Sequence, residues 1–168
     1  MANATAKISP EDTAKISPEE LTMRERRREA MAVLTCSSAA EIAKHLAAVD
    51  PLPAHRELRP PQSGLLMLRG RIGGDGAPFN FGEATVSRAA VRLGSGETGV
   101  GYVLGREQEQ ARLIALCDAL IQNESHRSQI EECVLEPIRK RLADERNLTA
   151  QQVAATKVEF FTLVRGEG

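Results

Sequence analysis

The spacing of the apolar residues changes along this chain from a helical period to a strand period and back, which limits the folds available to it. Helical spacing or helix-start signals mark residues 18–35, 38–49, 107–122 and the stretch from His126 to Leu142. Short apolar runs or strict alternation mark residues 64–72, 84–93, 100–104 and 156–164. This order predicts an α+β fold with a small antiparallel or mixed β-sheet covered by helices.

The alternation within residues 84–93 separates an apolar face from a charged one. Ala89, Val91 and Leu93 share one face, and Arg88 and Arg92 share the other, so we expect a half-buried strand with an arginine-bearing face. The turn 94–99 should join it to the strand 100–104 as a hairpin. This turn matches Gly-x-Gly-x-x-Gly, but a dinucleotide site needs a helix after the turn, so nucleotide binding is not favoured.

Prolines limit the segments on either side of this centre. Pro51, Pro53, Pro60 and Pro61 exclude a continuing helix between residues 52 and 63 and confine any strand there to a sheet edge. In the last helical stretch, Pro137 should kink the helix or restart it.

The N-terminus carries a repeat: residues 6–11 and 14–19 both read Ala-Lys-Ile-Ser-Pro-Glu. Residues 1–17 have no periodic apolar face, so we expect a disordered extension. Ser17 is the N-cap expected for the first helix. The remaining residues, 18–168, are of the size and composition of a single α+β domain.

Composition bears on the partners that the chain could bind. The net charge of −1 attracts no polyanion, and an aromatic content of 3% provides few platforms for stacked bases, so we expect no nucleic acid. Four arginines, at positions 24, 26, 27 and 28, surround Glu25 and Glu29. This cluster has two interpretations. The cluster could grip phosphate or nucleic acid, but an exposed helix face with internal ion pairs is the commoner arrangement.

The sequence gives little evidence for a metal site, a redox site or a membrane-spanning segment. Cys36, Cys117 and Cys133 form no Cys-x-x-Cys pair and resemble small buried hydrophobic residues. The histidines are isolated, so we expect no metal site. No apolar run has the length of a membrane span or the character of a signal peptide, so we expect a cytoplasmic protein without a membrane partner.

The densest motif is the glycine-rich segment between residues 70 and 82. Its backbone N–H groups could form an anion-binding concavity, or the segment could be a wide hairpin loop between strands 64–72 and 84–93; the residues favour neither. Asp75 and Glu83 could form an acid/base pair, although turn capping is commoner. The candidate ligand or interface residues are Arg69, Arg71, Gly73, Gly74, Asp75, Gly76, Asn80, Glu83 and Arg88.

This segment also carries a family resemblance. The run Arg71-Ile-Gly-Gly-Asp-Gly-Ala-Pro-Phe-Asn-Phe-Gly-Glu, with its continuation to Leu93, strongly resembles the PhnG family. Gly101-Tyr-Val-Leu-Gly-Arg, the opening Met31-Ala-Val-Leu and the tail 155–167 resemble it as well. The resemblance covers about residues 23–167 and leaves out the N-terminal repeat.

The resemblance implies a subunit of the bacterial carbon-phosphorus lyase complex, with PhnH-, PhnI- and PhnJ-like partners and with PhnL for the transferase step. That step replaces the adenine of ATP by methylphosphonate and gives α-D-ribose 1-methylphosphonate 5-triphosphate. The family picture puts nucleosidase chemistry on PhnI and radical iron-sulfur chemistry on PhnJ. It implies an assembly role without a catalytic residue here, with ATP as substrate of the complex and no cofactor bound by this chain alone.

Two other hypotheses remain. The loop 69–88 could supply ligand groups, such as Arg71 and Arg88, to a composite active site. Less favoured is a stand-alone anion-binding regulatory module that uses the helix with Arg24 and Arg28.

Overall fold

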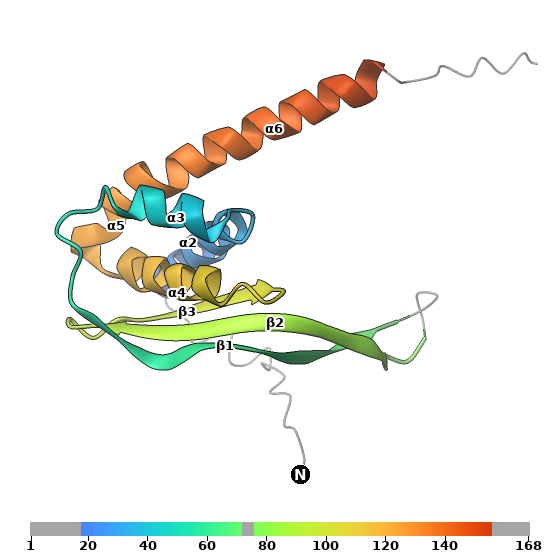
Figure 1. Cartoon of the computed structure of the whole chain (residues 1–168), viewed down its shortest axis with the longest axis horizontal. Coiled ribbons are helices and arrows are strands. Elements are labelled where there is room, and N and C mark those ends of the chain that lie inside the picture. Colours follow the sequence, from blue (N-terminus) through green and yellow to red (C-terminus); the bar gives the residue numbers. More distant parts are fainter. Residues whose placement is uncertain (1–17, 72–75, 156–168) are drawn as a thin grey trace, which may run out of the picture.

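The computed structural model of the chain describes residues 18–71 and 76–155. Figure 1 shows a sheet with the helices on one side of it. The helices are α2 (Pro18–Leu34), α3 (Ala39–Leu46), α4 (Gln108–Gln122), α5 (Glu124–Ile130) and α6 (Glu136–Ala155), with a π-helical turn η1 (Glu131–Leu135) between the last two. The strands are β1 (His55–Gly70), β2 (Phe79–Leu93) and β3 (Thr98–Leu104).

The sheet is antiparallel, with the strand order β1-β2-β3. The α+β prediction is therefore confirmed, in its antiparallel form. β1 and β2 have 16 and 15 residues, whereas β3 has 7, so the β1–β2 ribbon continues beyond the part of the sheet that β3 completes. In Figure 1 this ribbon also extends past the end of α4.

β1 begins well before the predicted strand 64–72. It includes Pro60 and Pro61, and it lies at an edge of the sheet, as the prolines required. The register shifts between Glu57 and Arg59 and again between Arg59 and Gln62, so irregular pairing accommodates the prolines. The prediction of an edge strand is confirmed, but its start was placed too late.

The glycine-rich loop is also shorter than predicted. The β1–β2 ladder continues to the pair Gly70 and Phe79, so Asn80, Gly82 and Glu83 lie within β2. Glycine permits a loop but does not require one, and ladder hydrogen bonds stabilise the extended backbone here. The hairpin interpretation is therefore confirmed for the described residues, without the wide loop.

The turn 94–99 is the predicted hairpin turn between β2 and β3. Gly96 has a φ of 112°, a conformation that favours glycine. The Glu97 carboxylate accepts hydrogen bonds from the Ser95 hydroxyl and from Asn123 Nδ2, the latter at 2.7 Å. The Ser95 hydrogen bond is the main cause that lowers the pKa of Glu97. The two side-chain hydrogen bonds of Glu97 stabilise the turn and the end of α4, which is a structural role.

The core lies between the inner face of the sheet and α4. Ala89, Val91 and Leu93 are buried on that face, as the alternation predicted. A Cβ added to Gly99 would lie 2.0 Å from the carbonyl oxygen of Ala115, and one added to Gly101 would lie 1.8 Å from that of Ala111. The backbones of β3 and α4 are therefore in direct contact.

The other helices complete the core on the far side of α4. Ser38 caps α3 as predicted, because its side chain accepts a hydrogen bond from the Glu41 N–H at 3.2 Å. The predicted interruption at Pro137 is confirmed: the π-helical turn η1 ends just before it. Proline has no N–H for the ordinary helical bond, which disturbs the helix at this point. Buried residues of these helices include Ala30, Leu34, Ile42, Leu46, Ile130, Val134 and Ile138.

Some predictions are wrong or lie outside the described residues. Cys117 is buried as expected and Cys133 is half-buried, but Cys36 is exposed. It follows the end of α2 in a short connection, where a small side chain need not be covered. The extension 1–17 and the strand 156–164 lie outside the described residues. No helix in the described ranges is long and apolar enough to cross a membrane.

Candidate functional site

The glycine-rich residues singled out in the sequence do not form one compact site. Gly73, Gly74 and Asp75 lie outside the described residues, so the pairing of Asp75 with Glu83 stays a prediction. Arg88 lies farther along β2, where β3 flanks it. The others lie at or near the free end of the hairpin: Arg69, Arg71, Gly76, Asn80 and Glu83.

We call the part of the hairpin that extends beyond β3 the distal arm, residues 65–70 and 79–85. Its ladder pairs Leu65 with Thr85 and Met67 with Glu83. No further described strand pairs with either edge of the arm, so each edge presents backbone N–H and C=O groups. Such edges can accept an additional strand from another chain.

The distal arm exposes large apolar side chains. Leu65 is 68% exposed, Phe81 60% and Met67 51%. The rings of Phe79 and Phe81 meet edge to face, with centroids 6.3 Å apart. Phe81 also lies over Gly70, where an added Cβ would be 2.9 Å from the ring. Contiguous apolar surface of this kind marks interaction sites on soluble proteins.

The described charged residues of the arm region lie apart from one another and from other charged groups. Arg69, Arg71 and Glu83 are exposed, and within the described residues none of them has an ion-pair partner. No group of His, Cys, Asp or Glu in residues 18–71 and 76–155 is arranged to hold a metal ion.

The ion pairs of the α2 arginines differ from those that the sequence predicted. In the described part of α2, none of them pairs with Glu25 or Glu29, so the expectation of internal ion pairs is wrong. Arg27 instead crosses to α4 and donates two hydrogen bonds of 2.8 Å to the Asp118 carboxylate. The Asp118 carboxylate on α4 has a fixed position relative to Arg27, whereas a glutamate on the exposed face of α2 does not.

Asp118 was missed by the sequence prediction. Its carboxylate is buried and also accepts a 2.8 Å hydrogen bond from the Val100 N–H. The hydrogen bond to Asp118 is the main cause that raises the pKa of Arg27. The pair therefore joins α2, α4 and β3. The available signal was an acidic residue within the apolar run of α4, between Cys117 and Ala119.

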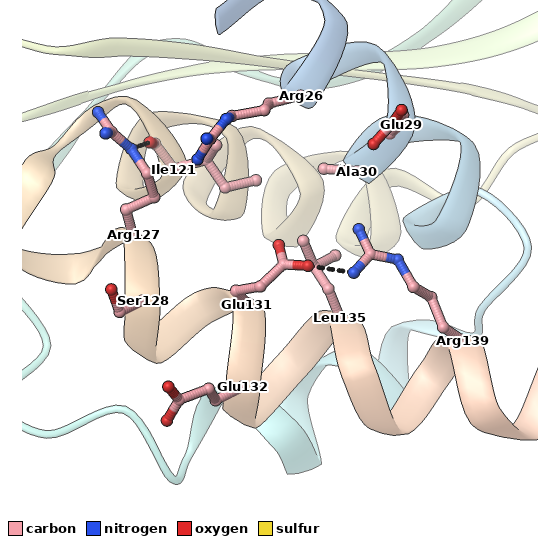
Figure 2. A pocket seen from close by; sticks show the side chains of 10 residues that line it. All are labelled: Arg26, Glu29, Ala30, Ile121, Arg127, Ser128, Glu131, Glu132, Leu135 and Arg139. Carbon is pink, nitrogen blue, oxygen red and sulfur yellow. Dashed lines mark hydrogen bonds and ion pairs between the residues drawn. The ribbon is translucent and has the colours of Figure 1, made fainter. Parts of the chain in front are cut away.

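Arg26 lines a cavity of about 410 Å³ between α2 and the helices α5 and α6 (Figure 2). Arg127 is held there by a 3.0 Å hydrogen bond from its Nε to the Ile121 carbonyl oxygen, and Arg139 pairs with Glu131. The arginines and glutamates of the lining are equal in number, so the cavity concentrates no net charge. The lining residues are Arg26, Glu29, Ala30, Ile121, Arg127, Ser128, Glu131, Glu132, Leu135 and Arg139.

Comparisons with known proteins agree on one family. The family model for the phosphonate metabolism protein PhnG matches residues 25–166. A relative from Rhizobium meliloti (strain 1021), the alpha-D-ribose 1-methylphosphonate 5-triphosphate synthase subunit PhnG, is 48% identical over 141 residues. The match covers 84% of this chain and 90% of the relative. The family resemblance of the glycine-rich segment is thereby confirmed, and the chain belongs to the PhnG family.

Proposed function

We propose that this chain is the PhnG subunit of a multi-subunit α-D-ribose 1-methylphosphonate 5-triphosphate synthase in phosphonate catabolism. That enzyme transfers the ribose 5-triphosphate moiety of ATP to methylphosphonate and releases adenine. The identity of 48% to a relative named as a subunit of this synthase supports the assignment. The chain contributes by assembly, without a catalytic residue of its own.

The distal arm is the observation that carries the assembly role. It exposes Leu65, Met67 and Phe81 on a hairpin whose edges have no further described strand. Burying apolar surface against a partner contributes about 25 cal/mol per Å², and the exposed edges can add backbone hydrogen bonds. An arm of this kind is stabilised by binding to another subunit.

The partners that we propose are PhnH-, PhnI- and PhnJ-like subunits, with PhnL for the transferase step. ATP is then a substrate of the complex, and this chain alone binds no cofactor. The cytoplasm is the compartment proposed for a complex that consumes ATP.

One observation favours a second candidate function, in which the arm lends ligand groups to a composite active site. Arg69 and Arg71 are exposed near the end of the hairpin, and within the described residues no carboxylate pairs with them. Guanidinium groups suit phosphate and phosphonate oxygens. The two candidates differ in whether these arginines are needed for turnover or only for binding.

The assembly role is tested by co-expression with PhnH-, PhnI- and PhnJ-like subunits and measurement of the particle mass by light scattering. The double variant Leu65→Ser, Phe81→Ser should fold normally, because both residues are exposed, and should bind the other subunits at least about tenfold more weakly. Leu148→Ser is the matched control, since Leu148 is 58% exposed on α6, away from the arm. Assembly of the arm variant with wild-type affinity would refute the arm's role.

A further inference from the structure

The sheet has a second exposed surface, on the side turned away from the helices (Figure 1). Residues directly opposite in an antiparallel ladder share a face, so the register identifies its members. Arg88 lies opposite Gln62 on β1 and Tyr102 on β3, and Arg92 lies opposite Arg56. We call this surface the outer arginine face: Arg56, Arg59, Arg88, Arg92, Leu66, Val100, Tyr102 and Leu104.

The charge of this face has a single sign. The strands contain two acidic residues, Glu57 and Glu83, and both belong to the opposite face, where they lie across from Val91 and Met67. Within the described residues, no carboxylate forms an ion pair with any arginine of the outer arginine face. Although the chain has a net charge of −1, its described residues place positive charge without paired carboxylates on one side of the sheet.

Arg88 is the central residue of this face. Its Nε atom is buried and has no hydrogen-bond partner in the described residues. A buried donor without an acceptor is destabilising, so such a group calls for a specific explanation. A carboxylate brought by another molecule would neutralise the charge of this guanidinium, with the paired geometry that guanidinium groups favour.

Large apolar side chains surround the arginines. Leu104 is 76% exposed, Val100 48%, Tyr102 43% and Leu66 42%. Arginine and tyrosine are among the residue types that contribute most of the binding energy at the centre of protein interfaces. Here both lie among aliphatic side chains. At the end of the sheet, Arg56 and Arg92 also line a cavity of about 380 Å³, which has room for a side chain from a partner.

We propose that the outer arginine face binds a protein surface that presents carboxylates among apolar side chains. The partner is another subunit of the synthase, so the inference rests on the proposed function and adds an interface on the face opposite to Leu65 and Met67 of the distal arm. Charge complementarity is the basis of this choice, because no carboxylate of the described residues pairs with the four arginines of the face.

Two other occupants fit the face less well. A second copy of this chain in a two-fold dimer would bring the same arginines against each other, and like charges oppose such pairing. Single-stranded nucleic acid would need aromatic platforms, and Tyr102 is the one aromatic residue among the members of the face. Exposed Val100, Leu66 and Leu104 also favour an apolar partner over a phosphate backbone.

The test measures the affinity of the full chain for the complex of PhnH-, PhnI- and PhnJ-like subunits at several salt concentrations. The variants are Arg88→Glu with Arg92→Glu, and Arg59→Glu as a second variant at an exposed edge position. Arg28→Glu is the matched control, because Arg28 is exposed on α2 and is outside the face. Thermal unfolding of each variant alone verifies its fold.

We expect the double variant to bind at least about tenfold more weakly and to lose most of the salt dependence of the wild type, while Arg28→Glu binds normally. Arg59→Glu should weaken binding in the same direction. Wild-type affinity for both outer-face variants would overturn the inference and leave the proposed function intact. Loss of a salt-dependent RNA or DNA affinity in the variants, with assembly unchanged, would also overturn it. If the wild-type chain binds none of these subunits, the proposed function fails first and the inference fails with it.

Discussion

Gly101 is a residue at which β3 packs directly against the backbone of α4. Its backbone faces the carbonyl oxygen of Ala111, and an added Cβ would lie 1.8 Å from that oxygen. We therefore expect Gly101→Ala to force α4 away from the sheet and to lower the free energy of unfolding by about 3 kcal/mol. The measurement is chemical denaturation, with Gly64→Ala as the control, because nothing lies within 4 Å of a Cβ at Gly64.

Equal losses in the Gly101 and Gly64 variants would contradict the close packing of β3 on α4. They would mean that the cost comes from placing alanine in a strand, whatever its surroundings.

Asp118 is the buried acceptor that joins three elements. Asp118→Ala leaves Arg27 and the Val100 N–H without their acceptor, although Arg27 is 32% exposed and can turn toward water. We expect a loss of about 2 to 3 kcal/mol in the free energy of unfolding, below the usual cost for a fully buried pair. Glu131→Ala, which removes an exposed ion pair with Arg139, should cost less than about 1 kcal/mol. A larger loss for the Glu131 variant would reverse this ranking.

The cysteines should differ in reactivity. Burial raises the pKa of the Cys117 thiol to about 12, so at pH 8 only on the order of one molecule in ten thousand carries the thiolate, the reactive form. Cys36 is exposed and should react with a maleimide within minutes, whereas Cys117 should react only after unfolding. Peptide mapping by mass spectrometry measures both rates. Equal labelling of the two in the native protein would show that α4 is not packed as described.

At the scale of elements, the distal arm is separable from the core. The buried apolar residues of the described chain do not include any between residues 67 and 83. We expect a chain in which an Asn-Gly turn replaces residues 67–83 to keep its helical content and a melting temperature within about 3 °C of wild type. Circular dichroism measures both properties, and light scattering should show that assembly is lost. Unfolding of the shortened chain would mean that the arm belongs to the folding unit.

The sequence predicted elements best where a side chain marks their boundaries. Ser38 identified the start of α3, and Pro137 identified the break before α6. The start of β1 was missed, because prolines are usually read as the end of a strand and here an edge position with irregular pairing accommodates them.

The candidate site was predictable in part. Alternation placed Arg88 and Arg92 together on one side of β2, which the register confirms. Arg56 and Arg59 belong to that face because β1 pairs with β2. A local sequence pattern does not contain the information about which strands pair. The partner of Arg27 was missed for the same reason, because Asp118 is 91 residues away in the sequence. Asp75 lies outside the described residues, so its role stays a prediction.

At the scale of the whole molecule, the sheet has one face covered by helices and one face that no described helix or strand covers. The helices lie on one side of the sheet, and the distal arm extends past the end of α4 (Figure 1). Four arginines without an ion-pair partner among the described residues lie on the uncovered face, and exposed apolar side chains lie there and on the distal arm, which suits a subunit that is completed by its neighbours.

The assembly role is tested most directly by adenine release from ATP and methylphosphonate, measured with the reconstituted complex and PhnL and divided by the amount of assembled particle. The complex is rebuilt with the chain in which Arg69→Ala and Arg71→Ala are combined. If this chain acts by assembly, the rate per assembled complex stays within about threefold of wild type. A loss of about a hundredfold or more in a fully assembled complex would contradict the account and assign these arginines to the active site.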